Sequence, residues 1–310
     1  MKILIPNTIE LRLSTDAEVV IYDVHAEIPS EHRDAEVLVS WHNSPRYLQD
    51  AARTLPRLRL VQALASGADV VLAAGFGDDV RICSGRSLHD GPVAEHALTL
   101  VLGAVRRLDR LHEAQRSHRW DEDFISAQAA PATHDLYTLA GSTVTIWGFG
   151  SIASRLAPML RMLGADVRGI ARTAGIRSGF EVHADTDASA VLADTDVLIS
   201  VLPATDETAD LFDAAVFGAL PQGAVFVNVG RGATVDEDAL RDALESGQLR
   251  AAAVDVTKTE PLPPESPLWD APNLVITPHV AGNRPVGAGA LIDENVARLR
   301  DGRELINRVG

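Results

Sequence analysis

The chain has 310 residues, 46% of them hydrophobic and 23% charged, which is typical of a globular protein with two domains. Its formal net charge of −15 argues against nucleic acid as a partner, because phosphate binding needs a basic surface. The single Cys83 excludes an internal disulfide and indicates a reducing compartment. No apolar run is long enough to span a bilayer, and the first residues lack the apolar region of a signal peptide. We therefore expect a cytoplasmic protein with no membrane partner.

Residues 1–91 alternate between short apolar runs and amphipathic segments. Strands are predicted at Lys2–Ile5, Glu18–Tyr22, Glu36–Ser40, Leu58–Ala63 and Val80–Cys83, and helices at Pro45–Leu55 and Asp69–Ala74. Because helices separate the strands, this pattern predicts a parallel sheet. After the fourth strand the loop Ser66-Gly67-Ala68 opens a helix, so its backbone N–H groups could bind a carboxylate. The same residues are also typical of an ordinary strand-to-helix turn.

A long apolar helix is predicted from Pro92 to Gln115, leading into a second domain after a hinge strand at His89–Gly91. Within this helix Glu95 and His96 are adjacent and do not face each other, so we interpret them as structural residues rather than as an acid–base pair. The stretch from Ser117 to Tyr137 is polar and aperiodic, which predicts an extended loop or arm.

The stretch Gly148-Phe-Gly150-Ser151-Ile152-Ala153 matches the G-x-G-x-x-G/A pattern of dinucleotide-binding turns. A β-branched run precedes it, and apolar residues at helical spacing follow it, as that pattern requires. Gly148 would allow the tight turn, and Gly150 would let backbone N–H groups approach a pyrophosphate. The helix that begins at Ser151 and Ile152 would present unpaired N–H donors to the anion. Taken alone, the stretch is also compatible with an ordinary strand-to-helix turn that has two glycines.

The strand–helix pattern then repeats to the end of the second domain. Further strands are predicted at Asp166–Ile170, Val197–Val201, Ala224–Val229, Ala251–Val256 and Leu274–Ile276, with helices at Ser189–Leu192, Ala209–Leu220 and Asp236–Ser246. Together with the strand before the glycine turn this gives six strands, the number in a doubly wound dinucleotide-binding sheet. Ligands of such sheets bind beyond the carboxyl ends of the strands.

The second strand of this domain ends in Arg172-Thr173. A site for NAD usually has an acidic residue here for the ribose hydroxyls, whereas an arginine favours the additional 2′-phosphate of NADP. Arg172 follows Gly150 by 172 − 150 = 22 positions, close to the expected offset. The sequence therefore predicts NADP(H) as the preferred cofactor, with NAD(H) as the alternative if Arg172 is only a surface residue.

An arginine, a carboxylate and a histidine follow the last three predicted strands. They are Arg231, Glu260 and His279. A guanidinium can bind the carboxylate and carbonyl oxygen of a 2-keto acid, and a histidine can deliver a proton to the forming alkoxide. A carboxylate bonded to that histidine would fix its orientation. The set therefore favours reduction of a 2-keto acid.

Several ordered motifs resemble those of the D-isomer-specific 2-hydroxyacid dehydrogenases, over essentially the whole chain. These are the glycine turn, Leu202-Pro203-Ala-Thr205 with Thr208, Gly230-Arg231-Gly232, Asp255-Val with Glu260-Pro-Leu-Pro and Ser-Pro-Leu-Trp269, and Thr277-Pro-His279. The resemblance implies an α/β protein of two doubly wound parallel-sheet domains with a cleft between them. A Rossmann dinucleotide-binding domain would span residues 92–282, and a flavodoxin-like substrate domain would comprise residues 1–91 and 283–310.

The resemblance also implies roles for individual residues. Arg231 would bind substrate, Glu260 and His279 would be the acid–base pair, and Asp255 would contact the nicotinamide carboxamide. The loop of Ser66, Gly67 and Ala68 would bind the substrate carboxylate. The remaining cofactor contacts would come from Gly148, Gly150, Ser151, Ile152, Arg172, Thr173, Leu202, Pro203, Thr208, Val229 and Gly230. Dimers through the nucleotide domain are usual in the family, which would explain the arm at residues 117–137.

We therefore predict an oxidoreductase that reduces a small 2-keto acid to a D-2-hydroxy acid with NADPH, or carries out the reverse with NADP. One alternative is an NAD-dependent short-form phosphoglycerate dehydrogenase, for which only Arg46, Arg53 and Arg86 offer a basic cluster. The other is a catalytically silent dinucleotide-sensing scaffold. The complete set of arginine, carboxylate and histidine argues against the scaffold, because a sensor needs no proton donor.

Overall fold

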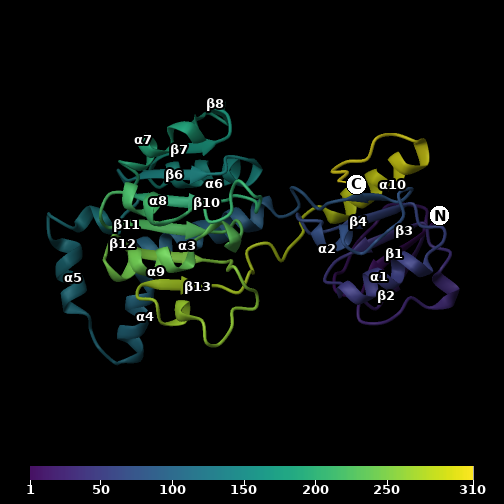
Figure 1. The fold of residues 1–310 in the computed structure, drawn as a ribbon, viewed down its shortest axis with the longest axis horizontal. Coiled ribbons are helices and arrows are strands. Elements are labelled where there is room, and N and C mark those ends of the chain that lie inside the picture. Colours follow the sequence, from purple (N-terminus) through teal and green to yellow (C-terminus); the bar gives the residue numbers. More distant parts are fainter. Residues whose placement is uncertain (310) are drawn as a thin grey trace. The chain divides into compact units, whose positions relative to one another are not determined.

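The computed structural model (Figure 1) describes residues 1–309, apart from the side chain of His134. The chain forms two compact units, each built on its own sheet. Met1–His89 and the segment from Asn283 onward form the N-terminal unit, and Asp90–Gly282 form the central unit. None of the helices in the described part of the chain is both long and apolar enough to cross a membrane.

The N-terminal unit contains five parallel strands in the order β2-β1-β3-β4-β5. Their bounds are Lys2–Pro6 (β1), Glu18–Tyr22 (β2), Val37–Ser40 (β3), Leu60–Ala63 (β4) and Arg81–Cys83 (β5). Each strand begins within two residues of its predicted start, because its β-branched run is bounded by polar turns. The strand order is that of flavodoxin-like sheets.

Helices cover both faces of this sheet. Successive residues of a strand point to opposite faces, and in β1 Leu4 packs on the side of α1 (Pro45–Thr54) and α2 (Asp69–Leu72). Its neighbour Ile3 packs on the side of α10 (Ala288–Asp301). The short 3-10 helix η1 (Ser30–His32) precedes β3.

Two buried contacts tie the C-terminal segment to this sheet. Asn295 of α10 donates from Nδ2 to Gln62 Oε1 at 2.7 Å, and both side chains are fully buried. Cys83, at the end of β5, pairs with Arg308 in an isolated bridge. Burial raises the pKa of the Cys83 thiol to about 11, so this cysteine is a structural residue. The C-terminal helix α10 therefore packs on the sheet formed by residues 1–89.

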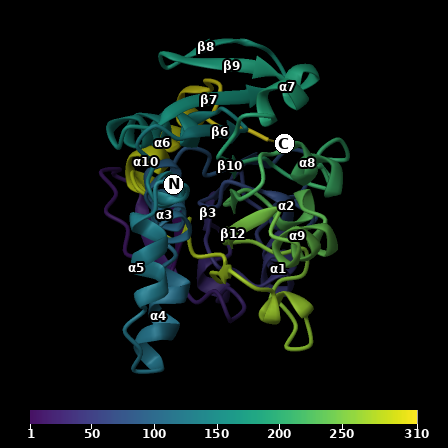
Figure 2. The same ribbon diagram turned by 90° about the vertical axis from the view of Figure 1, so that its left-hand side faces the viewer.

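The central unit contains an eight-stranded sheet in the order β13-β12-β11-β10-β6-β7-β9-β8. The strands are Thr143–Trp147 (β6), Asp166–Ala171 (β7), Gly175–Arg177 (β8), Phe180–Ala184 (β9), Val197–Ser200 (β10), Ala224–Asn228 (β11), Leu249–Val254 (β12) and Leu274–Ile276 (β13). All pairings are parallel except that of β8 with β9. Figure 2 shows the β8–β9 hairpin beside β7. The order is that of a Rossmann-type doubly wound sheet.

The predicted count of six strands in this sheet is wrong. Strands β8 and β9 were not predicted. The sequence of β9, Phe180-Glu-Val-His-Ala, alternates apolar and polar residues. Phe180 and Val182 turn inward into the core, whereas Glu181 is exposed. The alternation is that of a strand near the sheet edge, which is less apolar than the central strands.

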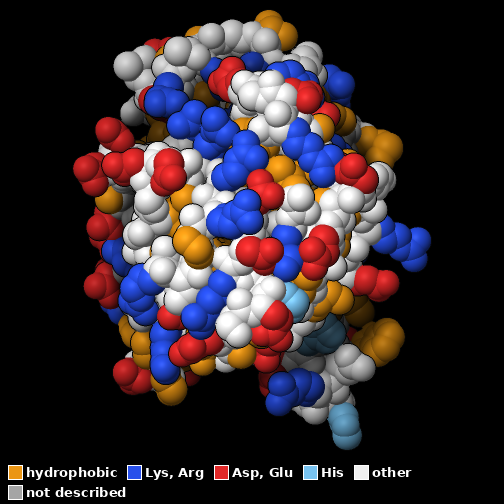
Figure 3. Space-filling model, turned by 90° about the vertical axis from the view of Figure 1, so that its right-hand side faces the viewer, with side chains coloured by type: hydrophobic (Ala, Val, Ile, Leu, Met, Phe, Trp, Pro, Cys, Tyr) orange, Lys and Arg blue, Asp and Glu red, His pale blue; other side chains and the backbone are white. Residues whose placement is uncertain are grey.

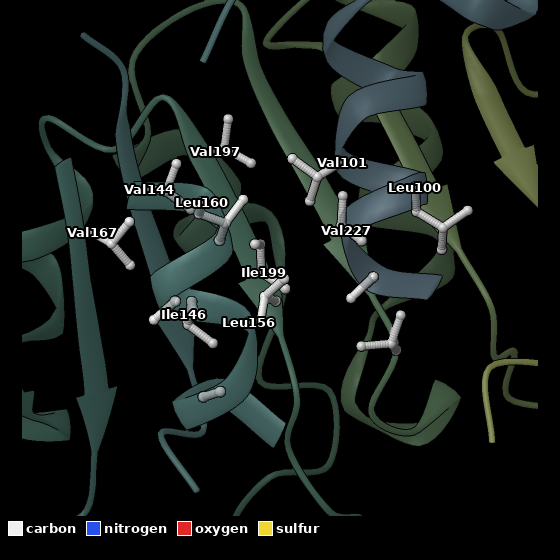
Figure 4. Packing of buried hydrophobic residues seen from close by; sticks show 14 of the residues in the cluster. Leu100, Val101, Val144, Ile146, Leu156, Leu160, Val167, Val197, Ile199 and Val227 are labelled. Carbon is white, nitrogen blue, oxygen red and sulfur yellow. The ribbon is translucent and has the colours of Figure 1, made fainter. Parts of the chain in front are cut away.

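Helices pack on both faces of the central sheet. One face is covered by α3 (Asp90–Val105) and α6 (Ser151–Met162), and the other by α7 (Ala188–Leu192), α8 (Ala214–Ala219) and α9 (Glu237–Glu245). Figure 4 shows how the first layer packs: Leu156 and Leu160 of α6 and Leu100 and Val101 of α3 lie against valines and isoleucines of the strands. The 3-10 helices η3 (Asp185–Asp187), η4 (Gly232–Thr234) and η5 (Pro267–Asp270) lie in the connections.

The predicted single helix from Pro92 to Gln115 is instead two helices. α3 ends at Val105, and α4 (Leu108–Arg116) begins after Arg107, whose φ of 53° lies in the left-handed region. The Arg107 guanidinium holds this break by donating to Asp109 and to Asn273 Oδ1 at 2.6 Å. The predicted hinge strand at His89–Gly91 is also absent, because Asp90 and Gly91 already belong to α3.

Two further predictions in this unit need correction. The stretch from Ser117 to Tyr137 is partly helical, with α5 (Glu122–Ala129) and η2 (His134–Tyr137). Asp121 caps α5 and is held by Arg110, which explains a helix in a polar stretch. The helix predicted from Ala209 is confined to α8, because Phe212 instead forms a bridge with Val235 and Asp213 caps the helix.

Charged side chains of both signs share the molecular surface. On the face in Figure 3, Lys and Arg side chains are interspersed with Asp and Glu. This face therefore lacks the uniformly basic surface that binding to a nucleic acid backbone requires.

Candidate active site

The glycine turn joins β6 to α6 with the geometry that a pyrophosphate site needs. Gly148 has a φ of 100°, and a Cβ there would lie 2.8 Å from the Val201 carbonyl oxygen, so only glycine fits. A Cβ added at Gly150 would meet nothing within 4 Å, so the space beside this backbone is open. Gly150 is the N-cap of α6, and the first helical N–H groups have no acceptor within the helix. These residues therefore fit a dinucleotide phosphate.

Three loops at the carboxyl ends of the strands meet around this turn. A Cβ on Gly148 would lie 3.2 Å from Leu202 Cδ2, and one on Gly230 would lie 2.5 Å from the Leu202 carbonyl oxygen. An internal hydrogen bond stabilises the loop from Leu202 to Thr208, since Thr208 Oγ1 donates to the Pro203 carbonyl at 2.7 Å. Val229 is buried, and its N–H donates to the Ser200 carbonyl at 3.1 Å, so neither its side chain nor its N–H is left for a ligand. The structure thus brings together the residues predicted after β6, β10 and β11.

His279 and Glu260 form a hydrogen-bonded pair. His279 Nδ1 lies 2.6 Å from Glu260 Oε2, and both side chains are more than a third exposed. The second carboxylate oxygen of Glu260 accepts the Thr257 N–H at 3.1 Å, which fixes the carboxylate plane. The imidazole is therefore oriented through Nδ1, and its Nε2 is the nitrogen left for a substrate.

Asp255 holds the turn that contains His279. Its carboxylate is buried and accepts hydrogen bonds from Thr277 Oγ1 at 2.5 Å and from the N–H groups of Val280 and Ala281 at 3.0 Å. Its carbonyl oxygen accepts the N–H of His279, whose φ of 52° lies in the left-handed region. These contacts give Asp255 a structural role. Its predicted contact with the nicotinamide carboxamide stays a prediction.

His96 belongs to the same network, which the sequence analysis missed. Its Nε2 lies 3.0 Å from Thr277 Oγ1 and 3.3 Å from Asp255 Oδ1. Helix α3 therefore stabilises the turn that contains His279 through the His96 side chain. The interpretation of His96 as structural rather than as a partner of Glu95 agrees with this geometry. No sequence signal links positions 96 and 255, because only the packing of α3 on the sheet brings them together.

Arg231 leaves the end of β11 on a rigid loop. Asn228 bonds to the Gly230 N–H at 2.9 Å and to the Arg231 carbonyl at 3.1 Å. A Cβ on Gly232 would lie 2.0 Å from the backbone of Thr257, so the Arg231 loop crosses directly against the loop of Glu260. The Arg231 guanidinium donates to Gly230 at 2.7 Å and, among residues 1–309, forms no ion pair. Its charge is therefore left for an anionic ligand.

Arg172 and Thr173 follow β7, and a third residue joins them. Arg172 is exposed. Arg177 of β8 donates to the Phe149 carbonyl in the glycine turn at 3.1 Å, and to the carbonyl and Oγ1 of Thr173, both at 2.8 Å. Arg177 is not among the predicted site residues, because the sequence pattern did not predict the β8–β9 hairpin that brings this residue back to the turn.

The predicted carboxylate loop lies in the N-terminal unit. Ser66, Gly67 and Ala68 follow β4 and precede α2, and Ser66 is exposed. The loop is anchored by Ala65, whose carbonyl accepts the Gly85 N–H at 2.7 Å. Within the described residues, no group of three or more His, Cys, Asp or Glu side chains is placed to hold a metal ion.

Comparisons with known proteins identify the same architecture. Residues 98–281 match the family model of the D-isomer specific 2-hydroxyacid dehydrogenase NAD binding domain. A D-isomer specific 2-hydroxyacid dehydrogenase family protein from Aeromonas salmonicida is 29% identical, with a TM-score of 0.82, covering 100% of this chain and 98% of the other. A D-isomer specific 2-hydroxyacid dehydrogenase from Xanthobacter autotrophicus, in complex with NADPH and MES, is 29% identical, with a TM-score of 0.79. The alignment covers 100% of this chain and 97% of that dehydrogenase.

A third solved structure adds a named activity. It is the NADPH-dependent glyoxylate/hydroxypyruvate reductase from Sinorhizobium meliloti, in complex with NADP and sulfate. It is 27% identical to this chain, with a TM-score of 0.80, and the alignment covers 99% of this chain and 97% of the reductase. The family model matches more than half of the chain, and the full-length similarities agree with it. The chain therefore belongs to the D-isomer specific 2-hydroxyacid dehydrogenase family, and it is an NAD(P)-dependent oxidoreductase.

Proposed function

We propose that the enzyme reduces a small 2-keto acid to the D-2-hydroxy acid with hydride from NADPH, or carries out the reverse reaction with NADP. The observation that supports this most is the 2.6 Å contact of His279 with Glu260. The same unit contains the glycine turn and the Arg231 guanidinium, which has no ion-pair partner among the described residues. The similarity to a reductase of glyoxylate and hydroxypyruvate supports small keto acids as substrates.

The chain's own residues can supply the other steps of this reaction. A bound reduced nicotinamide supplies the hydride. The planar guanidinium of Arg231 binds a carboxylate through two parallel N–H donors and can polarise the adjacent keto oxygen. His279, held through Nδ1 by Glu260, donates the Nε2 proton to the oxygen as it becomes an alkoxide. In the reverse direction the same nitrogen accepts the proton.

Substrate and cofactor can be identified together in one spectrophotometric screen. NADPH and NADH are each mixed with glyoxylate, hydroxypyruvate, pyruvate, 3-phosphohydroxypyruvate and bulkier keto acids, and nicotinamide absorbance is followed. We expect NADPH oxidation with the small unphosphorylated acids. Turnover confined to NADH and 3-phosphohydroxypyruvate would instead identify a phosphoglycerate dehydrogenase. Dinucleotide binding without turnover of any acid would identify a sensing scaffold.

The preference for NADPH is tested by Arg172→Asp. An aspartate would repel the 2′-phosphate and accept hydrogen bonds from the ribose hydroxyls of NADH. We expect the ratio of kcat/KM for NADPH to that for NADH to fall about 100-fold, the size expected for a hydrogen bond to a charged group. Arg116→Asp on α4 is the charge-matched control and should leave the ratio unchanged. A wild-type enzyme that already favours NADH would contradict the proposal.

We also propose roles for the two units. The central unit would bind the dinucleotide, which agrees with the family model matched at residues 98–281. The N-terminal unit would contribute Ser66, Gly67 and Ala68, whose backbone N–H groups suit the substrate carboxylate. The chain has a single cysteine, which forms no disulfide, and this supports the reducing cytoplasm as the location of the protein.

We further propose a homodimer formed through the central unit. Residues 117–137 contain exposed apolar side chains, including Trp120, which is 82% exposed, and Ile125. Light scattering should report a dimer for the wild type and a monomer for Trp120→Glu. Met162→Glu, at an equally exposed position on α6, is the control and should stay dimeric. A monomeric wild type would exclude this assembly.

A further inference from the structure

Arg177 lies at the corner between the glycine turn and the end of β7. We propose that Arg177 is the principal cation of a phosphate site, completed by Thr173 and Arg172, that recognises the 2′-phosphate of NADP(H). This inference rests on the proposed function, since it deepens the NADPH preference. Three observations support it: the hydrogen bonds of Arg177, the absence of an ion-pair partner for Arg177 among the described residues, and the hairpin that positions this side chain.

The β8–β9 hairpin places the Arg177 guanidinium beside the glycine turn. From β8, Arg177 reaches the Phe149 carbonyl, between the two glycines, and the Thr173 carbonyl and hydroxyl. The Arg177 side chain thus links the glycine turn to the segment that follows β7. In sheets of this type the adenosine ribose lies between these two elements.

The three hydrogen bonds leave part of the Arg177 guanidinium without an acceptor. All three acceptors of Arg177 are neutral oxygens, and among the described residues the guanidinium has no ion-pair partner. A guanidinium has five N–H groups, so two remain after these three bonds. The Thr173 hydroxyl accepts from Arg177, so its own proton is left to donate. These donors suit a phosphate, which accepts several hydrogen bonds and is bound well by planar guanidinium groups.

Arg172, the other cation of the proposed site, is exposed after the end of β7. Hydrogen bonds from the Thr205 side chain and from backbone lower the pKa of the Glu207 carboxyl, and the positive charge of Arg172 contributes to the same effect. A carboxylate is therefore within electrostatic reach of Arg172. Arg177 forms no ion pair among the described residues, and its three hydrogen bonds hold it beside the glycine turn, so we expect it to contribute at least as much as Arg172 to phosphate recognition.

The hairpin does not need Arg177 for its own stability. Its two-residue turn is Ser178-Gly179, with φ values of 51° and 80°, as in the type I′ turns that favour tight hairpins. Phe180, at the start of β9, is buried in the core beneath the Arg161 guanidinium, which stands 4.3 Å over its ring. A neutral residue at position 177 should therefore leave the hairpin folded.

Calorimetric titration of the full-length protein tests the site without any substrate. Adenosine 2′,5′-bisphosphate and 5′-AMP differ only in the 2′-phosphate, so the ratio of their Kd values isolates its recognition. We expect the wild type to favour the bisphosphate, and Arg177→Met to lower this preference about 10- to 100-fold with 5′-AMP binding unchanged. Arg177→Lys should keep part of the preference, because it retains the charge but loses the planar fork.

Arg161→Met is the matched control, since it removes a guanidinium that contacts the same hairpin from outside the proposed site. It should leave the Kd ratio unchanged. An equal loss in Arg161→Met and Arg177→Met would overturn the site and assign Arg177 to hairpin support. An unchanged ratio in Arg177→Met, or a wild type without preference, would also overturn it. Full discrimination by a protein that turns over no keto acid would contradict the proposed function alone.

Discussion

Replacing His279 by glutamine is expected to lower kcat for keto-acid reduction by about 10²- to 10⁴-fold, the contribution typical of a general acid–base group. Glutamine keeps a hydrogen bond to Glu260 but cannot release a proton at neutral pH. The glycine turn is untouched, so the Kd for NADPH should stay within about twofold of the wild type, because the substitution lies outside the residues proposed to bind the phosphates, and such changes usually alter free energies by no more than about 0.5 kcal/mol. Steady-state kinetics and fluorescence titration of NADPH measure the two quantities.

His112→Gln is the control for this change, because His112 is exposed on α4. It should retain wild-type turnover. Glu260→Gln should fall between the two, since it keeps a contact with Nδ1 but loses the charge that stabilises the imidazolium. Full activity in His279→Gln would show that the proton comes from another group or from water, and the proposed chemistry would fail.

Replacing Arg231 by alanine should lower kcat/KM for the keto acid by roughly 10²- to 10⁴-fold, because two hydrogen bonds to a charged group are lost. The loss should divide between a higher KM and a lower kcat, since the guanidinium binds the carboxylate in the ground state and polarises the reacting oxygen. Asn228 bonds to the backbone of this loop, so the loop itself should stay in place. Kinetics over a range of keto-acid concentrations separate the two contributions.

Two further variants sharpen the interpretation for Arg231. Arg231→Lys keeps the charge without the planar fork, so it should recover part of the KM effect and little of the kcat effect. Arg241→Ala on α9 removes an arginine that only pairs with exposed carboxylates, and it should be close to wild type. Equal activity of Arg231→Ala and Arg241→Ala would exclude Arg231 from substrate binding.

Sequence patterns located the strands best where both faces of the sheet are covered. Every strand predicted in the N-terminal unit is present, because buried parallel strands read as continuous β-branched runs. The β8–β9 hairpin was missed, since its alternating residues lie at the sheet edge and carry a weaker apolar signal. The break at Arg107 is not marked by a proline or glycine at that position. The Arg107 guanidinium contacts Asp109 and also Asn273, which lies 166 positions away and could not be foreseen from the local sequence.

The same distinction applies to the site. Arg231, Glu260 and His279 could be named because each follows a strand, and parallel strands end at one edge of the sheet. The structure adds the 2.6 Å distance of the pair and the fixed carboxylate plane. The partners of Asp255 could not be foreseen, because His96 reaches it across a helix–sheet interface that no local pattern encodes. Arg177 was missed for the related reason that its position depends on the overlooked hairpin.

The buried thiol of Cys83 makes the protein convenient for site-directed labelling. With a pKa of about 11, only about one thiol in 10⁴ is ionised at neutral pH, and no other cysteine competes for a maleimide. Cysteines introduced at Ile21 and Met162, which are 68% and 81% exposed, would take up a donor and an acceptor dye directly. Energy transfer between these dyes would then report whether the separation of the two units changes when NADPH or substrate is added.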